Sequence, residues 1–435
     1  MKTTIKNGLV ITFINEGYHS IKMKYADILI EDGRFAKISE SLPDEGEVID
    51  AAGKWILPGL INVGSNVAAS VLTQGLIPDY KRHNWQGSLI YSRVNPIMDL
   101  AEELLIEYEK YSVMKYGILR ALSSGSTYIV DMNRPSFVKA ANKASKELGV
   151  RSKIISMNTS GLFPKASHEG LLSCEYPNGG ALRSDHDSIP GLYSIETTSN
   201  ELWDQFKGLE DNDPLVLYGA YSNYEKQVSW TRYGKSPIAK INDSGALFDK
   251  TVLLQSLFTD FFDRERLRTA RSSISICPSD SIHDGIHPPI VDFLKQDINT
   301  SICTGITGHS MLEEMKLAAF GSKLDAGSAS QFQASDAFYA ASVAGSRAIG
   351  EPDTGRIDIG FQGDLLIIDP KRFAPTNYPL ISLIYAGGSR DIEKVVVGGK
   401  TVFDYDTHSE EITMLGMKVQ KIAEKIWASA RKNII

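Results

Sequence analysis

Side chains that could ligate a metal ion gather between residues 280 and 309 of this 435-residue sequence. Asp280, His283, Asp284 and His287 follow one another closely, and His309 comes later. Carboxylates and imidazoles hold divalent ions in proteins, so a metal cluster is one interpretation. His287 precedes a proline, which disfavours a regular helix, so the spacing need not place both imidazoles on one face. Separate histidines in a solvated loop are the more ordinary interpretation.

Two further residues could do chemistry. Cys277 could act as a nucleophile with His283 or His309 as its base, although a cysteine after an apolar run is more typically a small buried hydrophobe. Asp131 follows an apolar run that we interpret as a strand, and catalytic groups gather at strand ends in barrel enzymes. The simpler interpretation is that Asp131 pairs with Arg134 or caps the next turn.

The elements that would position these residues are strands and helices in alternation. From Pro58 onward, short apolar runs alternate with helical patterns, among them residues 101–123, 136–148, 310–319 and 335–349. This order predicts parallel strands with crossover helices, and about eight such units fit. Strand patterns at both ends of the chain, with hairpin signals at Asp32-Gly33 and Gly398-Gly399, predict one further β domain, and residues 410–432 have helical periodicity.

Composition narrows the classes of partner and compartment. The formal charge of −7 provides no basic field for nucleic acid or an anionic membrane, so a small or neutral ligand fits better. Cys174, Cys277 and Cys303 are far apart, which predicts neither a disulfide framework nor a thiolate zinc site and favours the cytoplasm. An apolar run of about 18 residues, as a membrane span needs, is absent from the sequence.

Nearly the whole chain resembles one family. The stretches that carry the resemblance are residues 26–38, 48–62, 313–318, 340–350, 355–360, 363–369 and 385–392. They resemble the amidohydrolase superfamily, in the branch of triazine hydrolases and cytosine, guanine and S-adenosylhomocysteine deaminases. The resemblance implies an α/β fold with a (β/α)8 TIM-type barrel over residues 58–355. Residues 1–57 and 356–435 would form a composite β-sandwich with a C-terminal helix, and the protein would be a homo-oligomer.

Members of that family hydrolyse a ring C–N or C–Cl bond with one divalent metal, which lowers the pKa of bound water. The resemblance assigns the metal ligands to five positions that hold other residues here: Gly64, Asn66, Tyr218, Gln255 and Thr307. It assigns the acid/base glutamate to the position of Tyr221 and a substrate-polarising histidine to that of Phe258. We therefore predict no metal and no other cofactor, and a barrel centre lined only by uncharged side chains.

Aromatic residues would line this cavity. Tyr218, Tyr221 and Phe258 could fill it or stack on a small planar molecule in the barrel mouth. Trp85, with Arg82 and His83, belongs to a loop that covers the pocket in relatives, where it would contact a ligand or anchor the loop.

Three functions follow from these interpretations. The main prediction is a metal-free relative, catalytically inactive or divergent, that binds a small molecule or a partner. The alternative is a hydrolase of non-peptide carbon–nitrogen bonds, such as an aminohydrolase, deaminase or chlorohydrolase, with a displaced or absent metal. The third is a metal-independent isomerase or lyase that uses Tyr218, Tyr221 or His309 as acid or base.

Overall fold

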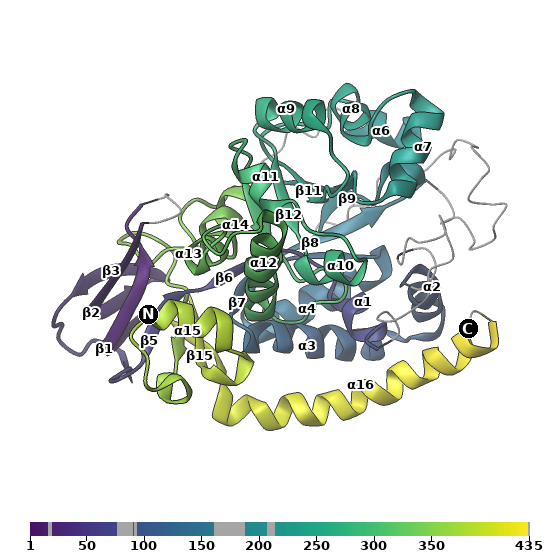
Figure 1. The fold of residues 1–435 in the computed structure, drawn as a ribbon. Helices are drawn as coiled ribbons and strands as arrows, with labels where there is room; N and C mark the ends of the chain where they lie inside the picture. Colours follow the sequence, from purple (N-terminus) through teal and green to yellow (C-terminus); the bar gives the residue numbers. More distant parts are fainter. Residues whose placement is uncertain (16–19, 76–89, 91–93, 161–187, 207–213, 434–435) are drawn as a thin grey trace.

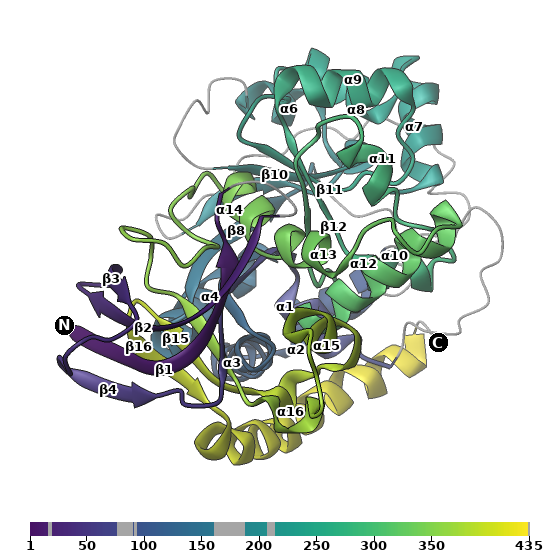
Figure 2. The ribbon, with the colours of Figure 1, turned by 60° about the vertical axis from the view of Figure 1, so that its left-hand side comes forward.

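The computed structural model describes residues 1–15, 20–75, 90, 94–160, 188–206 and 214–433. Within these ranges the chain forms a barrel of parallel strands and a second sheet to which both ends of the chain contribute (Figure 1). Figure 2 shows the purple N-terminal strands and the yellow-green C-terminal strands together at one side of the barrel.

The barrel has eight strands, and every neighbouring pair is parallel. They are β6 (Leu60–Ser65), β7 (Ser126–Asn133), β8 (Arg151–Asn158), β9 (Ile189–Leu192), β10 (Leu215–Gly219), β11 (Thr251–Gln255), β12 (Ser273–Ile276) and β13 (Thr300–Ile302). A parallel bridge between Ser65 and Gly305 brings the first strand beside the last, which nearly closes the ring. The predicted (β/α)8 barrel is confirmed.

The second sheet joins the two ends of the chain. Its strands are β1 (Lys2–Phe13), β2 (Ile21–Glu31), β3 (Arg34–Ser39), β4 (Glu47–Asp50), β5 (Trp55–Pro58), β14 (Leu365–Ile368), β15 (Ile392–Val397) and β16 (Lys400–Asp404). β5 pairs antiparallel with β14 and so links the N-terminal strands to the C-terminal ones. The hairpins at Asp32-Gly33 and Gly398-Gly399 are confirmed, and all four residues have positive φ. The domain limits stay a prediction.

Helices cover the outside of the barrel. They are α1 (Val67–Leu72), α2 (Asn95–Leu104), α3 (Glu107–Ser123), α4 (Val138–Leu148), α6 (Asn200–Phe206), α7 (Asn223–Tyr233), α8 (Pro237–Asp243), α9 (Phe261–Ala270), α10 (Pro278–His283), α11 (Ile290–Leu294), α12 (Met311–Ala326), α13 (Ala334–Ala340), α14 (Val343–Ala348), α15 (Pro379–Ala386) and the long α16 (Tyr405–Asn433). Short 3-10 turns are η3 (Pro135–Phe137), η4 (Ile195–Thr197), η5 (Pro370–Phe373) and η6 (Ser389–Asp391). Among the described residues, no helix is both long and apolar enough to cross a bilayer.

Two predicted helices are interrupted. The pattern over residues 101–123 is split between α2 and α3, because Leu105 and Ile106 are extended and Glu109 caps the new helix by accepting a hydrogen bond from the Ile106 amide (3.1 Å). The pattern over residues 335–349 is split between α13 and α14 at Ala341 and Ser342. Apolar periodicity continued across both breaks, so it did not reveal them.

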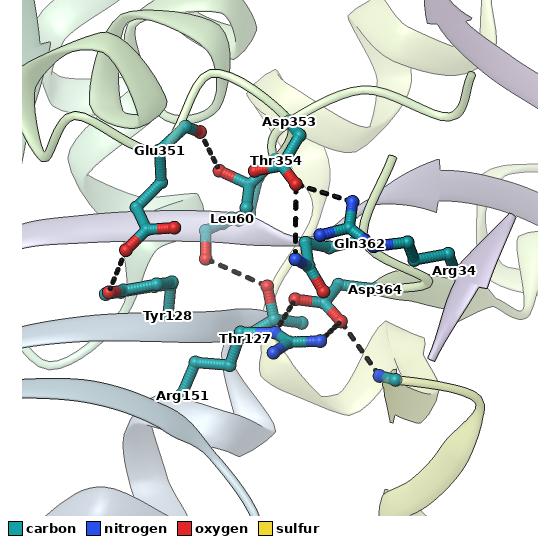
Figure 3. Close-up of polar contacts among 11 residues, drawn as sticks. Arg34, Leu60, Thr127, Tyr128, Arg151, Glu351, Asp353, Thr354, Gln362 and Asp364 are labelled. Carbon is teal, nitrogen blue, oxygen red and sulfur yellow. Dashed lines mark hydrogen bonds and ion pairs between the residues drawn. The ribbon is translucent and has the colours of Figure 1, made fainter. Parts of the chain in front are cut away.

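The amino ends of the barrel strands are fastened to the second sheet by an ion pair (Figure 3). Arg151, at the start of β8, contacts both carboxylate oxygens of Asp364, at 2.7 and 3.1 Å. Asp364 is only 6% exposed and also accepts a hydrogen bond from the Gly398 amide (2.8 Å). The amino-end face of such barrels usually serves stability, so we interpret this contact as structural.

The barrel interior is a packed core. Val130, Ile155, Val216 and Val252, from β7, β8, β10 and β11, are completely buried inside it. These side chains separate the two ends of the barrel, so a site at the carboxyl ends is reached only from that side.

Candidate active site

A pocket lies at the carboxyl ends of the barrel strands, where barrel enzymes place their sites. The described residues enclose about 50 Å³, and they are Ile90, Tyr218, Tyr221, Ser222, Gln255, Leu257, Asp280, Ser281, Asp284 and Ile306. Pockets for small molecules usually measure about 300–1,000 Å³, so the space that these residues enclose matches only part of a small molecule. Of the predicted lining, Tyr218, Tyr221 and Gln255 lie on this pocket. Half-buried Phe258 is outside this lining, where Leu257 stands instead, and Trp85 lies outside the described residues.

Backbone strain marks the rim of this pocket. Ala220, Gln255 and Ser256, which end or directly follow β10 and β11, have φ values of 55, 71 and 50°. Residues other than glycine adopt such values at a cost of about 1–3 kcal/mol each, and they cluster at functional sites. Here the sharp backbone turn leaves the Gln255 side chain on the pocket wall.

Asp280 places a carboxylate in this pocket, so the expectation of a wholly uncharged barrel centre is wrong. Its Oδ1 accepts hydrogen bonds from the amide (2.7 Å) and the hydroxyl (2.6 Å) of Thr307. Its Oδ2 accepts hydrogen bonds from the backbone amide of Ile306 (3.1 Å) and from the side-chain amide of Gln255 (3.3 Å). Burial raises the pKa of Asp280, and the hydrogen bonds from Thr307 and Ile306 oppose that rise. A carboxylate from α10 thus lies against Thr307, at the eighth-strand position where the family resemblance puts an aspartate.

Two buried carboxyl groups flank Tyr221 behind the pocket. The Tyr221 hydroxyl donates to Oε1 of Glu196 at 2.7 Å, and its amide donates to Oε2 of Glu225 at 2.8 Å. Burial first, and the charge of Glu196 second, raise the pKa of Glu225 well above its ordinary value. The phenol of Tyr221 is therefore hydrogen-bonded to one buried carboxyl group and its backbone to another, although the acid/base position itself carries no glutamate.

Tyr218 is a neutral wall of the pocket. Its ring lies 5.4 Å from that of Tyr221 and 6.0 Å from that of Tyr193. Burial raises the pKa of Tyr218 well above its ordinary value, so its hydroxyl keeps its proton and cannot act as a base near neutral pH. Tyr218 and Tyr221 line the pocket, and Tyr193 packs next to Tyr218.

Cys277 is not a nucleophile. It is completely buried at the start of α10, and its Sγ accepts a hydrogen bond from the Asp280 amide at 3.4 Å. Burial, with the neighbouring charges of Asp280 and Glu314, raises its pKa well above the ordinary value. A nucleophilic cysteine must be a thiolate, whereas this one stays a thiol.

The proposed rim cluster does not form among the described residues. Asp280 and Asp284 line the pocket, but His283 is exposed, and His287 is 3.4 Å from Asp325 on α12. Burial and the charge of Arg120 lower the pKa of His309 to about 3, so this imidazole is neutral and is a poor base.

Asp131 is structural, and its predicted pairing with Arg134 is wrong. Its carboxylate accepts hydrogen bonds from the Val67 amide at the start of α1 (2.9 Å) and from Asn133 (2.7 Å). Burial raises its pKa to about 7. Arg134 instead pairs with Asp99 and Glu102 on α2.

The five positions at which the family resemblance puts a metal do not offer suitable donors. Asn66 caps α1 by accepting a hydrogen bond from the Ala69 amide (3.3 Å), and the space beside Gly64 is filled by Leu254 and Cys303. Thr307 donates to Asp280, while Gln255 bonds Asp280, Ser281 and the Cys277 amide. Across the part of the chain that the structure describes, no three His, Cys, Asp or Glu side chains are grouped to hold an ion. The residues at these five positions therefore do not fit the metal that the family resemblance implies.

The nearly closed (β/α)8 barrel with a pocket at its carboxyl ends can be compared with known proteins. A model of the amidohydrolase family matches residues 236–402. The chain is 26% identical over 404 residues to a 5'-deoxyadenosine deaminase of Methanosphaera stadtmanae, covering 88% of this chain and 91% of that protein. It is 24% identical over 421 residues to a 5-methylthioadenosine/S-adenosylhomocysteine deaminase of Pyrococcus horikoshii, covering 92% and 94%. An adenosine deaminase from Xanthomonas campestris with bound zinc has the same fold, with a TM-score of 0.82 at 17% identity over 97% of this chain and 98% of that one.

The predicted resemblance to the amidohydrolase superfamily is confirmed by the family model and by the curated relatives. The prediction of an inactive relative is wrong, because relatives that match along most of the chain are named as deaminases, which points to an active aminohydrolase. These relatives give no support to a pseudoenzyme or to metal loss. Replaced ligands at five positions were therefore not a sound basis for predicting inactivity.

Proposed function

We propose that this protein is an aminohydrolase that replaces the exocyclic amino group of a planar nitrogen heterocycle by oxygen and releases ammonia. The observation that carries the proposal is the similarity, along most of the chain, to deaminases whose names give adenine nucleosides as substrates. An adenine-like ring is accordingly the first substrate class to test.

The pocket suits the amino-bearing edge of such a ring. Tyr218 and Tyr221 offer aromatic faces and edges, which pack well against a flat heterocycle. Opposite them, Asp280 accepts hydrogen bonds, and an exocyclic amino group is a donor. Ser222 and Asp284 are only partly buried, so we place the rest of the substrate toward their side of the pocket.

Asp280 also supplies acid/base chemistry. Hydrolysis forms a C–O bond from water to the ring carbon and breaks the C–N bond, so one proton must leave the water and one must reach the departing nitrogen. Oδ2 of Asp280 has the longer hydrogen bonds of its two oxygens and is the atom that would take the water proton and return it to the amine. Its raised pKa brings this carboxyl nearer to the working pH.

The direct test is ammonia release from 5'-deoxyadenosine, 5-methylthioadenosine, S-adenosylhomocysteine, adenosine and guanine. The proposal predicts stoichiometric ammonia and a product in which oxygen replaces the amino group, with no ammonia from the corresponding oxo compounds. Failure of every amino-bearing compound, with protein shown to be folded, would overturn the proposal.

Three other properties remain predictions. A homo-oligomer is testable by light scattering, and a cytoplasmic location by fractionation. The isomerase or lyase alternative predicts turnover without ammonia, which the same assay detects.

A further inference from the structure

A second carboxyl group lies behind the pocket wall. Glu314, near the start of α12, is only 1% exposed, and its Oε2 accepts a hydrogen bond from the Ser279 amide at 2.9 Å. Burial is the largest cause that raises its pKa, to about 8, and the charges of Asp280 and Glu313 add to the rise. Near neutral pH, Glu314 therefore holds a proton inside the protein.

Hydroxyl groups connect this carboxyl to the one in the pocket. The Thr307 hydroxyl lies 2.6 Å from Oδ1 of Asp280 and 2.9 Å from the Ser279 hydroxyl. The Ser279 side chain in turn hydrogen-bonds to Glu314. The chain of groups is thus continuous from the buried carboxyl to the pocket, and both Thr307 contacts are within hydrogen-bond distance.

We propose that Glu314 is the internal proton store of Asp280, reached through the hydroxyls of Ser279 and Thr307. This inference rests on the proposed aminohydrolase function and adds to it a residue that does not touch the substrate. Glu314 is accordingly a positioning residue, and Asp280 is the group that faces the reacting atoms.

The protons balance along this path. The Thr307 hydroxyl is within reach of both Ser279 and Asp280. Transfer requires the hydroxyls to turn so that Glu314 donates to Ser279, Ser279 donates to Thr307, and Thr307 donates to Asp280. When each hydroxyl passes its proton one step on, Asp280 becomes the protonated acid and Glu314 the carboxylate. One proton moves, no bond between heavy atoms changes, and nothing is oxidised or reduced.

The other titratable groups around the path do not interrupt it. Cys277 lies 3.9 Å from Oε2 of Glu314 and stays a neutral thiol, and burial likewise raises the pKa of Cys303 beyond the working range. Glu313 is exposed on the same helix turn, and Tyr218 keeps its proton in the pocket. Asp284 is the further titratable group that lines the pocket with Asp280.

The experiment compares Glu314→Gln and Thr307→Val with the matched control Glu313→Gln, which removes an exposed carboxylate one residue away. Glu314→Gln keeps the side-chain shape and Thr307→Val keeps the volume, and either one interrupts the path. We expect kcat for ammonia release to fall about 100-fold in both, with KM nearly unchanged, and the control to match wild type. Unchanged kcat in the two relay variants would overturn the proposal.

A second readout does not depend on activity. Infrared spectroscopy should show a protonated carboxyl at neutral pH that is lost in Glu314→Gln and retained in Glu313→Gln. In Asp280→Asn the midpoint of its titration should fall by about one pH unit, because a like charge has been removed. If the Glu314 carboxyl band behaves as expected in a protein that releases no ammonia, the proposed function alone is refuted. If the carboxyl band survives in Glu314→Gln, the proton store is refuted.

Discussion

Replacing Asp131 by asparagine should change how the stability of this protein depends on pH. Asp131 is 1% exposed, and burial raises its pKa from the ordinary 3.8 to about 7. The folded state therefore binds more protons than the unfolded state between these values, so this carboxyl lowers stability progressively as the pH rises through that window. Asparagine cannot ionise, so any unfolding free energy that Asp131→Asn loses through altered hydrogen bonds is the same at every pH.

The size of the effect follows from the two pKa values. The whole difference corresponds to about 4 kcal/mol, at about 1.36 kcal/mol for each pKa unit. Between about pH 5 and about pH 8, wild type should lose about 2–3 kcal/mol of unfolding free energy relative to Asp131→Asn.

Urea unfolding of wild type, Asp131→Asn and the exposed-site control Asp249→Asn measures this difference. Asp249 is exposed before β11, so its variant should follow wild type at both pH values. A gap between wild type and Asp131→Asn that stays constant from pH 5 to pH 8 would show that this carboxyl is not held at a raised pKa, and the burial reasoning used for Asp280 and Glu314 would lose its support.

Three further outcomes follow from named contacts. Arg151→Met should lower the unfolding free energy by about 2 kcal/mol, because Asp364 would stay buried without its cation while Arg151 is itself partly exposed; a loss below about 0.5 kcal/mol in urea unfolding contradicts this. Tyr221→Phe should lower kcat more than it raises KM, since Glu196 loses its hydroxyl donor, and unchanged steady-state kinetics contradicts it. Gln255→Ala should leave the metal content of the purified protein unchanged in elemental analysis, because this side-chain amide already bonds Asp280 and Ser281. Loss of one ion per chain would contradict the conclusion that Gln255 does not hold a metal.

Much of the fold was predictable because local patterns determine it. The hairpin at Asp32-Gly33 follows from residues that tolerate positive φ, and the alternation of apolar runs with helical patterns implied parallel strands. The breaks at Leu105 and Ser342 were missed, since apolar residues face the core on both sides of them. Periodicity reports which face is buried and is insensitive to a change of direction between two helices.

The site was predicted only in part, because its chemistry arises from contacts between distant segments. Tyr218, Tyr221 and Gln255 lie on the pocket at or just beyond the ends of β10 and β11. Asp280 had been considered only as part of a metal cluster, and nothing in the sequence showed that Thr307 would hold its carboxylate. Each ligand position could be examined singly in the sequence, but the charge in the pocket comes from Asp280 on α10.

Glu196 and Glu314 were missed altogether. Glu196, in η4 after β9, accepts a hydrogen bond from Tyr221, which follows β10. Glu314, on α12, accepts one from Ser279 on α10. The available signal for Glu314 was that it lies within a stretch resembling the family, directly after the eighth strand. Burial of both carboxyls became visible only in three dimensions.

The most direct test of the proposed role of Asp280 compares ammonia release by wild type and by Asp280→Asn. The assay uses the best substrate among the amino-bearing compounds. We expect turnover by wild type and by Asp249→Asn. In Asp280→Asn we expect the rate of ammonia release to fall about 100-fold or more while the protein stays folded. Equal rates in wild type and Asp280→Asn would contradict it.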